Sequence, residues 1–408
     1  MMQRPTGAAG ERGQEACRGL DTVRNSPTLG ALFTSFLRLG SVSFGGPGMV
    51  PYIGRLAVDR RRWLDQEEFR VGVALCQAVP GATAMQAAAY VGLRARGFAG
   101  AVATYVGFGL PAFVLMLVLS LAYGQTANIH AVTAALAGLR AVVVALVVNA
   151  AWTFGRPSID SARAAVIAVA SAGLFLIGGN PFLIVLGAGL AGSLLLKRNA
   201  GCQADAGPQP RSSWRTLRGP LVVLATACTL LVSLALVDPR LAELCAVMMK
   251  VDVFAFGGGF ASVPLMFHEV VEARRWMPAS VFLDGIALGQ VTPGPIVITA
   301  TFVGQRVAGV AGALVATASI FLPSLLMFLV ADHFFRRLQA RPEVAAAARG
   351  FVLSFVGLLA FVAVNFSLVT SWNVVSIALA VIGLGALLLK VDVVWVVLVA
   401  GLLSPLLL

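Results

Sequence analysis

Residues 43–48 read Ser43-Phe44-Gly45-Gly46-Pro47-Gly48, and residues 255–259 read Ala255-Phe256-Gly257-Gly258-Gly259. After each stretch, the same residue types follow at the same spacing, give or take one position. In the first half these are Pro51, Trp63, Gln77, Pro80, Gly81, Gly92, Arg94, Gly97, Gly100 and Pro111, and in the second half they are Pro264, Trp276, Gln290, Pro293, Gly294, Gly304, Arg306, Gly309, Gly312 and Pro323. The chain therefore contains two copies of one unit, with Gly/Pro breaks at matching places, a pattern that points to a transporter binding site.

The composition excludes a soluble protein of this length. Hydrophobic residues make up 59% of the chain and charged residues 12%, and the mean hydropathy is +0.89. Long apolar runs fill residues 29–196 and 221–408. Helices satisfy their own backbone hydrogen bonds where water is absent. We therefore predict an all-α polytopic membrane protein with about 13 apolar segments.

The apolar runs divide the chain into five parts. The N-terminal tail is polar and Arg-rich and lacks the apolar core of a signal peptide, so we expect it to be disordered and cytoplasmic. The linker is rich in Gly, Pro, Ser, Gln and Arg, which is typical of a flexible cytoplasmic connection. The predicted parts are the tail (1–28), the first repeat (29–198), the linker (199–219), a connecting transmembrane helix (220–238) and the second repeat (239–408).

The number of apolar segments predicts that the repeats are inverted. Each repeat has an even number of them and returns to its starting side, provided that short segments such as 162–177 and 180–196 are counted separately. The connecting helix then makes the second repeat enter from the opposite face. Residues 55–96 are rich in Arg, whereas residues 269–306 have balanced charges. This asymmetry places the first region and the N-terminus in the cytoplasm, and the C-terminus in the periplasm.

The first break of each repeat follows an apolar segment, at Phe44, Gly45, Gly46 and Pro47 and again at Phe256, Gly257, Gly258 and Gly259. Glycine adopts backbone angles that other residues avoid, and proline ends a simple helix. Exposed N–H groups beside the start of a half-helix form an anion-binding array. The alternative is close helix packing through small residues. Because the break occurs in both copies, we favour a binding site.

The second break interrupts segments 66–93 and 279–305, at Gln77, Pro80 and Gly81 and again at Gln290, Thr292, Pro293 and Gly294. Each segment is either a re-entrant hairpin or a discontinuous helix. Irregular backbone at this depth is tolerated where it is buried in protein or lines a cavity. The two glutamines are candidate substrate ligands, although each could instead bond to a neighbouring helix.

A cation precedes the first break in both copies, Arg38 in one and Lys250 in the other, at the same spacing. Intramembrane cations usually face a cavity or a partner, so both are candidate substrate ligands. The alternatives are snorkelling to the interface or, for Lys250, a local pair with Asp252 or Glu243. Asp252 is also the candidate proton-coupling group. Arg140 is a further candidate, or else a helix contact to Asn149 or a carbonyl.

Other function classes find little support. The five cysteines form no CxxC pair and no Cys/His cluster with metal spacing, so we expect no metal and no cofactor. No nucleotide-binding or catalytic motif is present, which argues against an enzyme. The net charge of +12 is best explained by basic cytoplasmic segments that orient the helices in the lipid bilayer, and not by a nucleic-acid surface.

The duplicated motifs Ser43–Gly48, 77–81, 256–259 and 290–295 resemble the chromate ion transporter (CHR) family, in its long-chain, two-domain form. The resemblance covers nearly the whole chain except the tail and the linker. It implies antiport of chromate out of the cell across the bacterial inner membrane, driven by the proton-motive force and conferring chromate resistance. It also implies competition by sulfate, an isosteric dianion.

The residues support a mechanism of alternating access between the repeats. We expect the amides of Gly45, Gly46, Gly257 and Gly258 to bind the dianion near the bilayer midplane, with Arg38 and Lys250 neutralising it. A transporter or channel for sulfate or another oxyanion remains an alternative, as does a membrane-embedded enzyme. The sequence leaves the oligomeric state open, with a homodimer as one option.

Overall fold

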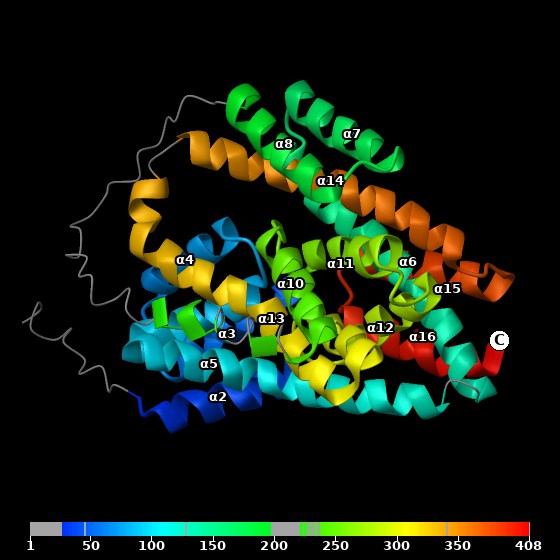
Figure 1. The fold of residues 1–408 in the computed structure, drawn as a ribbon, viewed down its shortest axis with the longest axis horizontal. Helices are drawn as coiled ribbons and strands as arrows, with labels where there is room; N and C mark the ends of the chain where they lie inside the picture. Colours follow the sequence, from blue (N-terminus) through cyan, green and yellow to red (C-terminus); the bar gives the residue numbers. More distant parts are fainter. Residues whose placement is uncertain are drawn as a thin grey trace, which may run out of the picture.

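A computed structural model of the protein describes residues 27–44, 46–126, 129–196, 221–222, 224–226, 229, 233–234, 237–339 and 342–407. These residues form helices and their connections, and no strand occurs among them (Figure 1). Residues 1–26 of the tail and the linker lie outside the described residues. Within the predicted connecting helix, the described residues up to Val237 are helical.

The two repeats consist of matching helices in the same order, and they differ in their short 3-10 helices: η1 has no counterpart in the second repeat, and η5 has none in the first. The first contains α2 (Leu29–Val42), η1 (Gly46–Met49), α3 (Val50–Gly54), η2 (Arg55–Arg60), α4 (Gln66–Ala78), α5 (Thr83–Thr126), α6 (His130–Ser158), α7 (Ala162–Leu176) and α8 (Pro181–Leu195). The second contains α10 (Pro239–Val253), α11 (Gly259–Phe267), η4 (His268–Ala273), α12 (Ala279–Val291), η5 (Ile296–Ile298), α13 (Thr299–Gln339), α14 (Pro342–Val369), α15 (Val374–Leu388) and α16 (Val393–Leu407). The predicted fold class of duplicated, broken helices is confirmed.

The first break is the tip of a hairpin in which the chain turns back on itself. In the first repeat, Arg61 Nη2 donates to Ser35 Oγ at 3.3 Å, and the rings of Trp63 and Phe36 stack with centroids 6.5 Å apart. Residues before the break thus contact residues after it. In the second repeat, Glu243 near the start of α10 pairs in the same way with Arg274 after η4, at 2.8 Å.

The second break is also the tip of a hairpin, which decides between the two possibilities left open by the sequence. Tyr90 on the returning arm donates to the Glu68 carbonyl on the entering arm at 3.0 Å. Gly72 lies directly against the Tyr90 ring, where a Cβ would overlap it. In the second repeat, Gly285 meets Phe302 in the same manner. The arms α4 and α12 are 13 residues long, shorter than the roughly 20 residues that a bilayer crossing needs, so segments 66–93 and 279–305 have the geometry of re-entrant hairpins.

Within the part of the chain that the structure describes, four helices are long and apolar enough to cross a bilayer, and they lie within Thr83–Thr126, His130–Ser158, Ile296–Phe334 and Pro342–Val369. α5 and α13 each contain a tight reversal at a left-handed glycine, Gly97 (φ +64°) and Gly309 (φ +61°). The long part of each helix after the glycine is the crossing segment. α7 and α8 form a returning pair, because Arg163 Nη1 donates to the Leu195 carbonyl at 3.2 Å. Because the hairpins and the α7–α8 pair each bring the chain back, each repeat ends on the side where it begins.

Ion and ring contacts between the repeats show that they are inverted. Arg94, at the outer end of the second hairpin of repeat one, pairs with Asp332 near the far end of α13. Arg306, at the matching place in repeat two, lies over the ring of Tyr123 near the far end of α5, 5.9 Å from its centroid. Each crossing helix therefore ends where the other repeat's hairpins begin, so the hairpins enter from opposite faces.

The repeats also interlock through their later helices. α7 and α8 of repeat one pack against α14 of repeat two, while α15 and α16 of repeat two pack against α6 of repeat one (Figure 1). Both crossings are close because the contact residues are small. Gly192 lies against the backbone of Gly350, and Gly138 lies against Ser404. Small residues allow such close approach of helices in membranes.

The inverted arrangement predicts opposite accessibility of two equivalent positions. Arg62 and Arg275 are both exposed and both have left-handed backbone, with φ of 52° and 53°. In a cysteine-free background, a membrane-impermeant maleimide added to intact cells should label the Arg275→Cys variant and leave the Arg62→Cys variant unlabelled. Everted vesicles should give the opposite pattern. Labelling of both from the same side would contradict the inversion.

Candidate functional site

The breaks of the two repeats meet through a reciprocal pair of backbone hydrogen bonds. The Gly81 N–H donates to the Ala255 carbonyl at 3.0 Å, and the Gly294 N–H donates to the Ser43 carbonyl at 2.8 Å. Ala255 and Ser43 are the residues directly before the first break of each repeat. The second break of each repeat therefore docks on the first break of the other, as two-fold symmetry requires.

These junctions require glycine. Gly81 has φ +107° and Gly294 has φ +124°, a region that side chains rarely adopt. A Cβ at Gly81 would overlap Ser324 Oγ, and a Cβ at Gly294 would lie 2.6 Å from the Ala112 Cβ. Ser324 and Ala112 are themselves equivalent, since each follows the proline within its long helix. The backbone angle and the close packing therefore both require glycine at positions 81 and 294.

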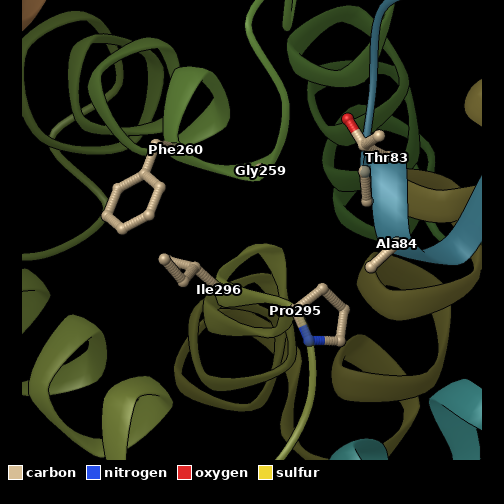
Figure 2. A pocket seen from close by; sticks show the side chains of 7 residues that line it. Thr83, Ala84, Gly259, Phe260, Pro295 and Ile296 are labelled. Carbon is tan, nitrogen blue, oxygen red and sulfur yellow. The ribbon is translucent and has the colours of Figure 1, made fainter. Parts of the chain in front are cut away.

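A small pocket lies beside these junctions, between the repeats. It is lined by Ala82, Thr83, Ala84, Gly259, Phe260, Pro295 and Ile296. Figure 2 shows Thr83 and Ala84 on one side and Phe260 on the other, with Pro295 and Ile296 between them. The pocket has room for about one water molecule. It is therefore smaller than a tetrahedral oxyanion in this conformation.

The lining residues come from the starts of three helical segments. α5 begins at Thr83, α11 begins at Gly259, and η5 begins at Ile296 and leads directly into α13. The first N–H groups of a helix have no intrahelical acceptor, and each helix start carries roughly half a positive charge. Three starts around one pocket create a positive, donor-rich environment that suits an anion.

Three polar side chains, those of Thr83, Gln86 and Ser262, lie in the first turns of α5 and α11. Thr83 Oγ1 would be 3.3 Å from a Cβ at Gly258, which places this hydroxyl beside the first break of repeat two. Gln86 is buried and its Nε2 donates to the Pro80 carbonyl at 2.7 Å. Gln86 Oε1 and Ser262 Oγ are buried without a hydrogen-bond partner. Such atoms are uncommon in folded proteins. The Ser262 hydroxyl can donate a hydrogen bond to an anion, whereas the Gln86 amide oxygen can only accept one.

The structure brings some of the predicted site residues close together. The backbones at Pro80, Gly81, Gly258, Gly259 and Gly294 lie at the junctions or the pocket, and Pro293 is buried directly before Gly294.

The rest of the first break in repeat two packs on α14. The Phe256 ring stacks on Phe351 with centroids 4.1 Å apart. A Cβ at Gly257 would lie 2.7 Å from the Phe355 ring. In repeat one, Phe44 is half-buried and Gly46 and Pro47 start η1, whereas Gly45 lies outside the described residues.

The predicted polar ligands of the second break lie elsewhere. Gln77 is exposed on α4, whereas Gln290 is buried on α12. Thr292 donates to the Leu288 carbonyl of its own helix at 2.9 Å. None of the three lines the pocket.

The predicted cations do not line the pocket either. Arg38 is exposed on α2, on the side of the helix away from the buried Phe36 and Gly40. Lys250 Nζ pairs with Glu269 Oε1 at 2.8 Å and lies 3.7 Å from the centroid of the Phe182 ring. Its partner is thus neither Asp252 nor Glu243, the two nearest acidic residues in the sequence, because the hairpin brings η4 beside α10.

Arg140 also has a partner that the sequence does not reveal. Its Nε and Nη2 donate to the two carboxylate oxygens of Asp284 at 2.6 and 2.7 Å. Tyr123 donates to Asp284 Oδ2 at 2.8 Å. Neither Asn149 nor a carbonyl is the partner, and the pair joins α6 of repeat one to α12 of repeat two.

Sequence reasoning missed Thr83, Gln86, Ser262 and Ile296. All of them lie within one turn after a break. Their position directly after the breaks could have identified them, because the N-terminal turn of a half-helix supplies the hydrogen-bond donors at an anion site. The charged residues before the breaks were the more conspicuous candidates, and they lie outside the pocket.

Comparisons with known proteins agree with this architecture. The family model described as "Chromate transporter" matches residues 30–193 and 242–404, which correspond to the two repeats. An uncharacterized transporter of Methanocaldococcus jannaschii is 38% identical over 94% of this chain and 96% of its own length. No solved structure matches.

Several relatives carry chromate in their names. The chromate transport protein of Pseudomonas aeruginosa is 32% identical over 91% of this chain and 90% of its own length. That of Cupriavidus metallidurans is 29% identical over 83% of each chain. The apolar helices, the duplicated breaks and these matches together show that the chain is a multi-pass membrane protein belonging to the chromate transporter family.

Proposed function

We propose that the protein is a secondary transporter that exports chromate across the bacterial inner membrane, driven by the proton-motive force and conferring chromate resistance. The proposal rests on one observation, the pocket at the meeting point of two inverted repeats, lined by three helix starts. The names of the relatives support chromate as the substrate and transport in preference to an enzymatic reaction. The Arg-rich hairpin end of repeat one supports a cytoplasmic N-terminus and a periplasmic C-terminus.

Chromate binds at the pocket, after the two repeats separate enough to admit it. The three helix starts supply roughly 1.5 positive charges in total, close to the charge of the dianion. The Thr83 hydroxyl and the amides at Gly258 and Gly259 donate to its oxygens. Lys250 is held by Glu269 and Arg38 is exposed, so we assign both a role in attracting or guiding the anion outside this closed state.

Alternating access follows from the reciprocal junctions. Each second break rests on the other repeat through one backbone hydrogen bond, so loosening one junction opens the pocket towards one face. The inverted symmetry makes the two openings equivalent. A negative-inside potential assists the outward step by about 4.6 kcal/mol per 100 mV for a dianion.

Sulfate is the principal alternative substrate, because helix starts and a hydroxyl recognise any tetrahedral dianion. The experiment is uptake of radiolabelled chromate into everted vesicles, with and without an uncoupler and with excess sulfate or phosphate. We expect uptake above that of vesicles lacking the protein, abolished by the uncoupler and reduced by sulfate. Uptake no greater than in the vesicles lacking the protein would refute the proposed function.

Replacing Thr83 tests the position of the site. A Thr83→Val variant removes a hydroxyl that donates to a charged ligand, an interaction worth about 2 kcal/mol. The half-saturating chromate concentration should therefore rise by roughly tenfold or more. Thr126→Val is the matched control, because Thr126 is a partly exposed threonine at the far end of α5 and donates to the Ala122 carbonyl. Equal half-saturation in both variants would move the binding site away from this pocket.

A further inference from the structure

A buried carboxyl group with a single polar partner lies directly behind one of the two junctions. The Asp252 side chain is 0% exposed. Its Oδ2 accepts from the Ser324 N–H at 2.6 Å, and its carboxylate accepts from the Ser324 hydroxyl at 2.6–2.7 Å. No described Lys, Arg or His side chain forms an ion pair with it. A buried, uncompensated carboxylate is costly in a membrane and usually marks a functional group.

The carboxyl group is in contact with the moving part of the transport site. A Cβ at Gly81 would lie 3.1 Å from Asp252 Oδ1 and would overlap Ser324 Oγ. The Asp252 carbonyl accepts from the Ala255 N–H at 3.1 Å, and the Ala255 carbonyl accepts from the Gly81 N–H at 3.0 Å. Asp252 and Ser324 thus form the surface on which the second break of repeat one rests.

The fold does not need a carboxyl group at this position, as the other repeat shows. The equivalents of Asp252 and Ser324 are Gly40 and Ala112. There the helices close up instead, because a Cβ at Gly40 would overlap the Phe108 carbonyl oxygen. The matching junction, Gly294 on Ala112, forms without any titratable group. The carboxyl is therefore an addition to one of two otherwise equivalent junctions.

The other titratable groups around Asp252 are engaged elsewhere. From α5, the Tyr105 hydroxyl donates to the Phe321 carbonyl at 2.7 Å and lies near enough to interact with Asp252. On α10, Lys250 pairs with Glu269, and Cys245 accepts from Ser319 at 3.0 Å. Further along α13, Asp332 pairs with Arg94. None of these groups neutralises the Asp252 carboxylate directly.

We propose that Asp252 is the proton-binding site that couples transport to the proton gradient. This inference rests on the proposed function and adds the ligand, a proton, and its site. As a carboxylate, Asp252 accepts both Ser324 hydrogens and holds the Gly81 junction in place. When it binds a proton, one carboxyl oxygen becomes a donor, so the Ser324 hydroxyl must turn its own hydrogen away, beside Gly81. That rearrangement loosens the Gly81 junction while leaving the Gly294 junction unchanged. The proton returns to water when the site opens to the other face.

The test uses purified full-length protein in liposomes, with the membrane potential clamped by valinomycin and equal potassium. An acid-inside pH gradient should drive accumulation of radiolabelled chromate by the wild type. Asp252→Asn keeps the size of the side chain and its bonding to Ser324. We expect it to exchange internal for external chromate within about threefold of the wild-type rate, while gradient-driven accumulation is lost. Accumulation by Asp252→Asn equal to that of the wild type would overturn the proposal.

A second variant decides the matter if Asp252→Asn cannot be recovered folded. Ser324→Ala reproduces the residue found at position 112 and removes one donor to the carboxylate. The charged form loses a hydrogen bond, so it takes up a proton at higher pH, and the pH of half-maximal exchange should rise by about one unit. Ser319→Ala, on the same helix and facing Cys245, is the control and should not shift it. An unshifted profile in Ser324→Ala would overturn the proposal.

The wild-type arm separates this inference from the proposed function. If wild-type protein exchanges neither chromate nor sulfate, the proposed function fails and the coupling site fails with it. If the wild type exchanges and accumulates chromate but both variants behave like it, only the assignment of Asp252 fails.

Discussion

Replacing Gly81 or Gly294 with alanine should reduce transport severely, because each glycine forms one of the two junctions between the repeats. The new Cβ at Gly81 would overlap Ser324 Oγ, and the one at Gly294 would lie 2.6 Å from the Ala112 Cβ. Both positions also have φ values that alanine rarely adopts. Strain and overpacking together cost about 3 kcal/mol. We expect chromate uptake to fall by at least about tenfold in either variant.

Two control variants separate the causes of this loss. Gly97 also has positive φ, but its Cβ would have open space around it, and Gly30 has neither constraint. Gly30→Ala should transport normally, and Gly97→Ala should show the effect of backbone strain alone. Adding Ala112→Gly to Gly294→Ala removes the overlap and should restore part of the activity. Wild-type uptake by both Gly81→Ala and Gly294→Ala would show that the junctions are not part of the transport cycle.

The positions of the breaks could be predicted because glycine and proline act locally. Phe256–Gly259 and Pro293–Gly294 interrupt helices in any surrounding, so the sequence alone places them. The inversion of the repeats was equally accessible, because it depends on an even count of segments and on the distribution of arginine. Both inferences hold whether a broken segment crosses or re-enters, since a re-entrant hairpin returns to its starting side just as two crossings do.

The distinction between crossing and re-entering could not be predicted from composition. Segment 66–93 is long enough to span a bilayer once. Its folding into two arms depends on the contact between Gly72 and Tyr90, which no local pattern signals. The same holds for segment 279–305, where Gly285 receives Phe302.

The partners of the cations could not be predicted for a related reason. Glu269 reaches Lys250 only because the first hairpin of repeat two folds back, and Asp284 reaches Arg140 only because the two repeats pack together. Sequence distance gives no information about such pairs. The presence of an intramembrane cation therefore correctly predicted that the cation has a partner. The further prediction that this partner is the substrate is not favoured by the geometry of this state.

Truncating Asp284 should destabilise the protein strongly, because it breaks an ion pair across the interface between the repeats. The Asp284 side chain is 0% exposed, and Arg140 donates two hydrogen bonds to it. Asp284→Ala leaves a largely buried guanidinium without a counter-charge and the Tyr123 hydroxyl without its acceptor. Breaking such a pair costs about 3–5 kcal/mol. In detergent, the thermal transition followed by size-exclusion chromatography should fall clearly below that of the wild type.

The double variant decides whether Arg140 has a structural role or binds the substrate. Replacing both partners by leucine removes the charges together, and such exchanges are often neutral or stabilising. Asp284→Leu/Arg140→Leu should therefore recover much of the stability lost in either single variant, and its half-saturating chromate concentration should match that of the wild type. A recovered fold with greatly weakened chromate affinity would instead show that Arg140 leaves Asp284 to bind the substrate during the cycle. Single variants as stable as the wild type would show that this ion pair does not hold the repeats together.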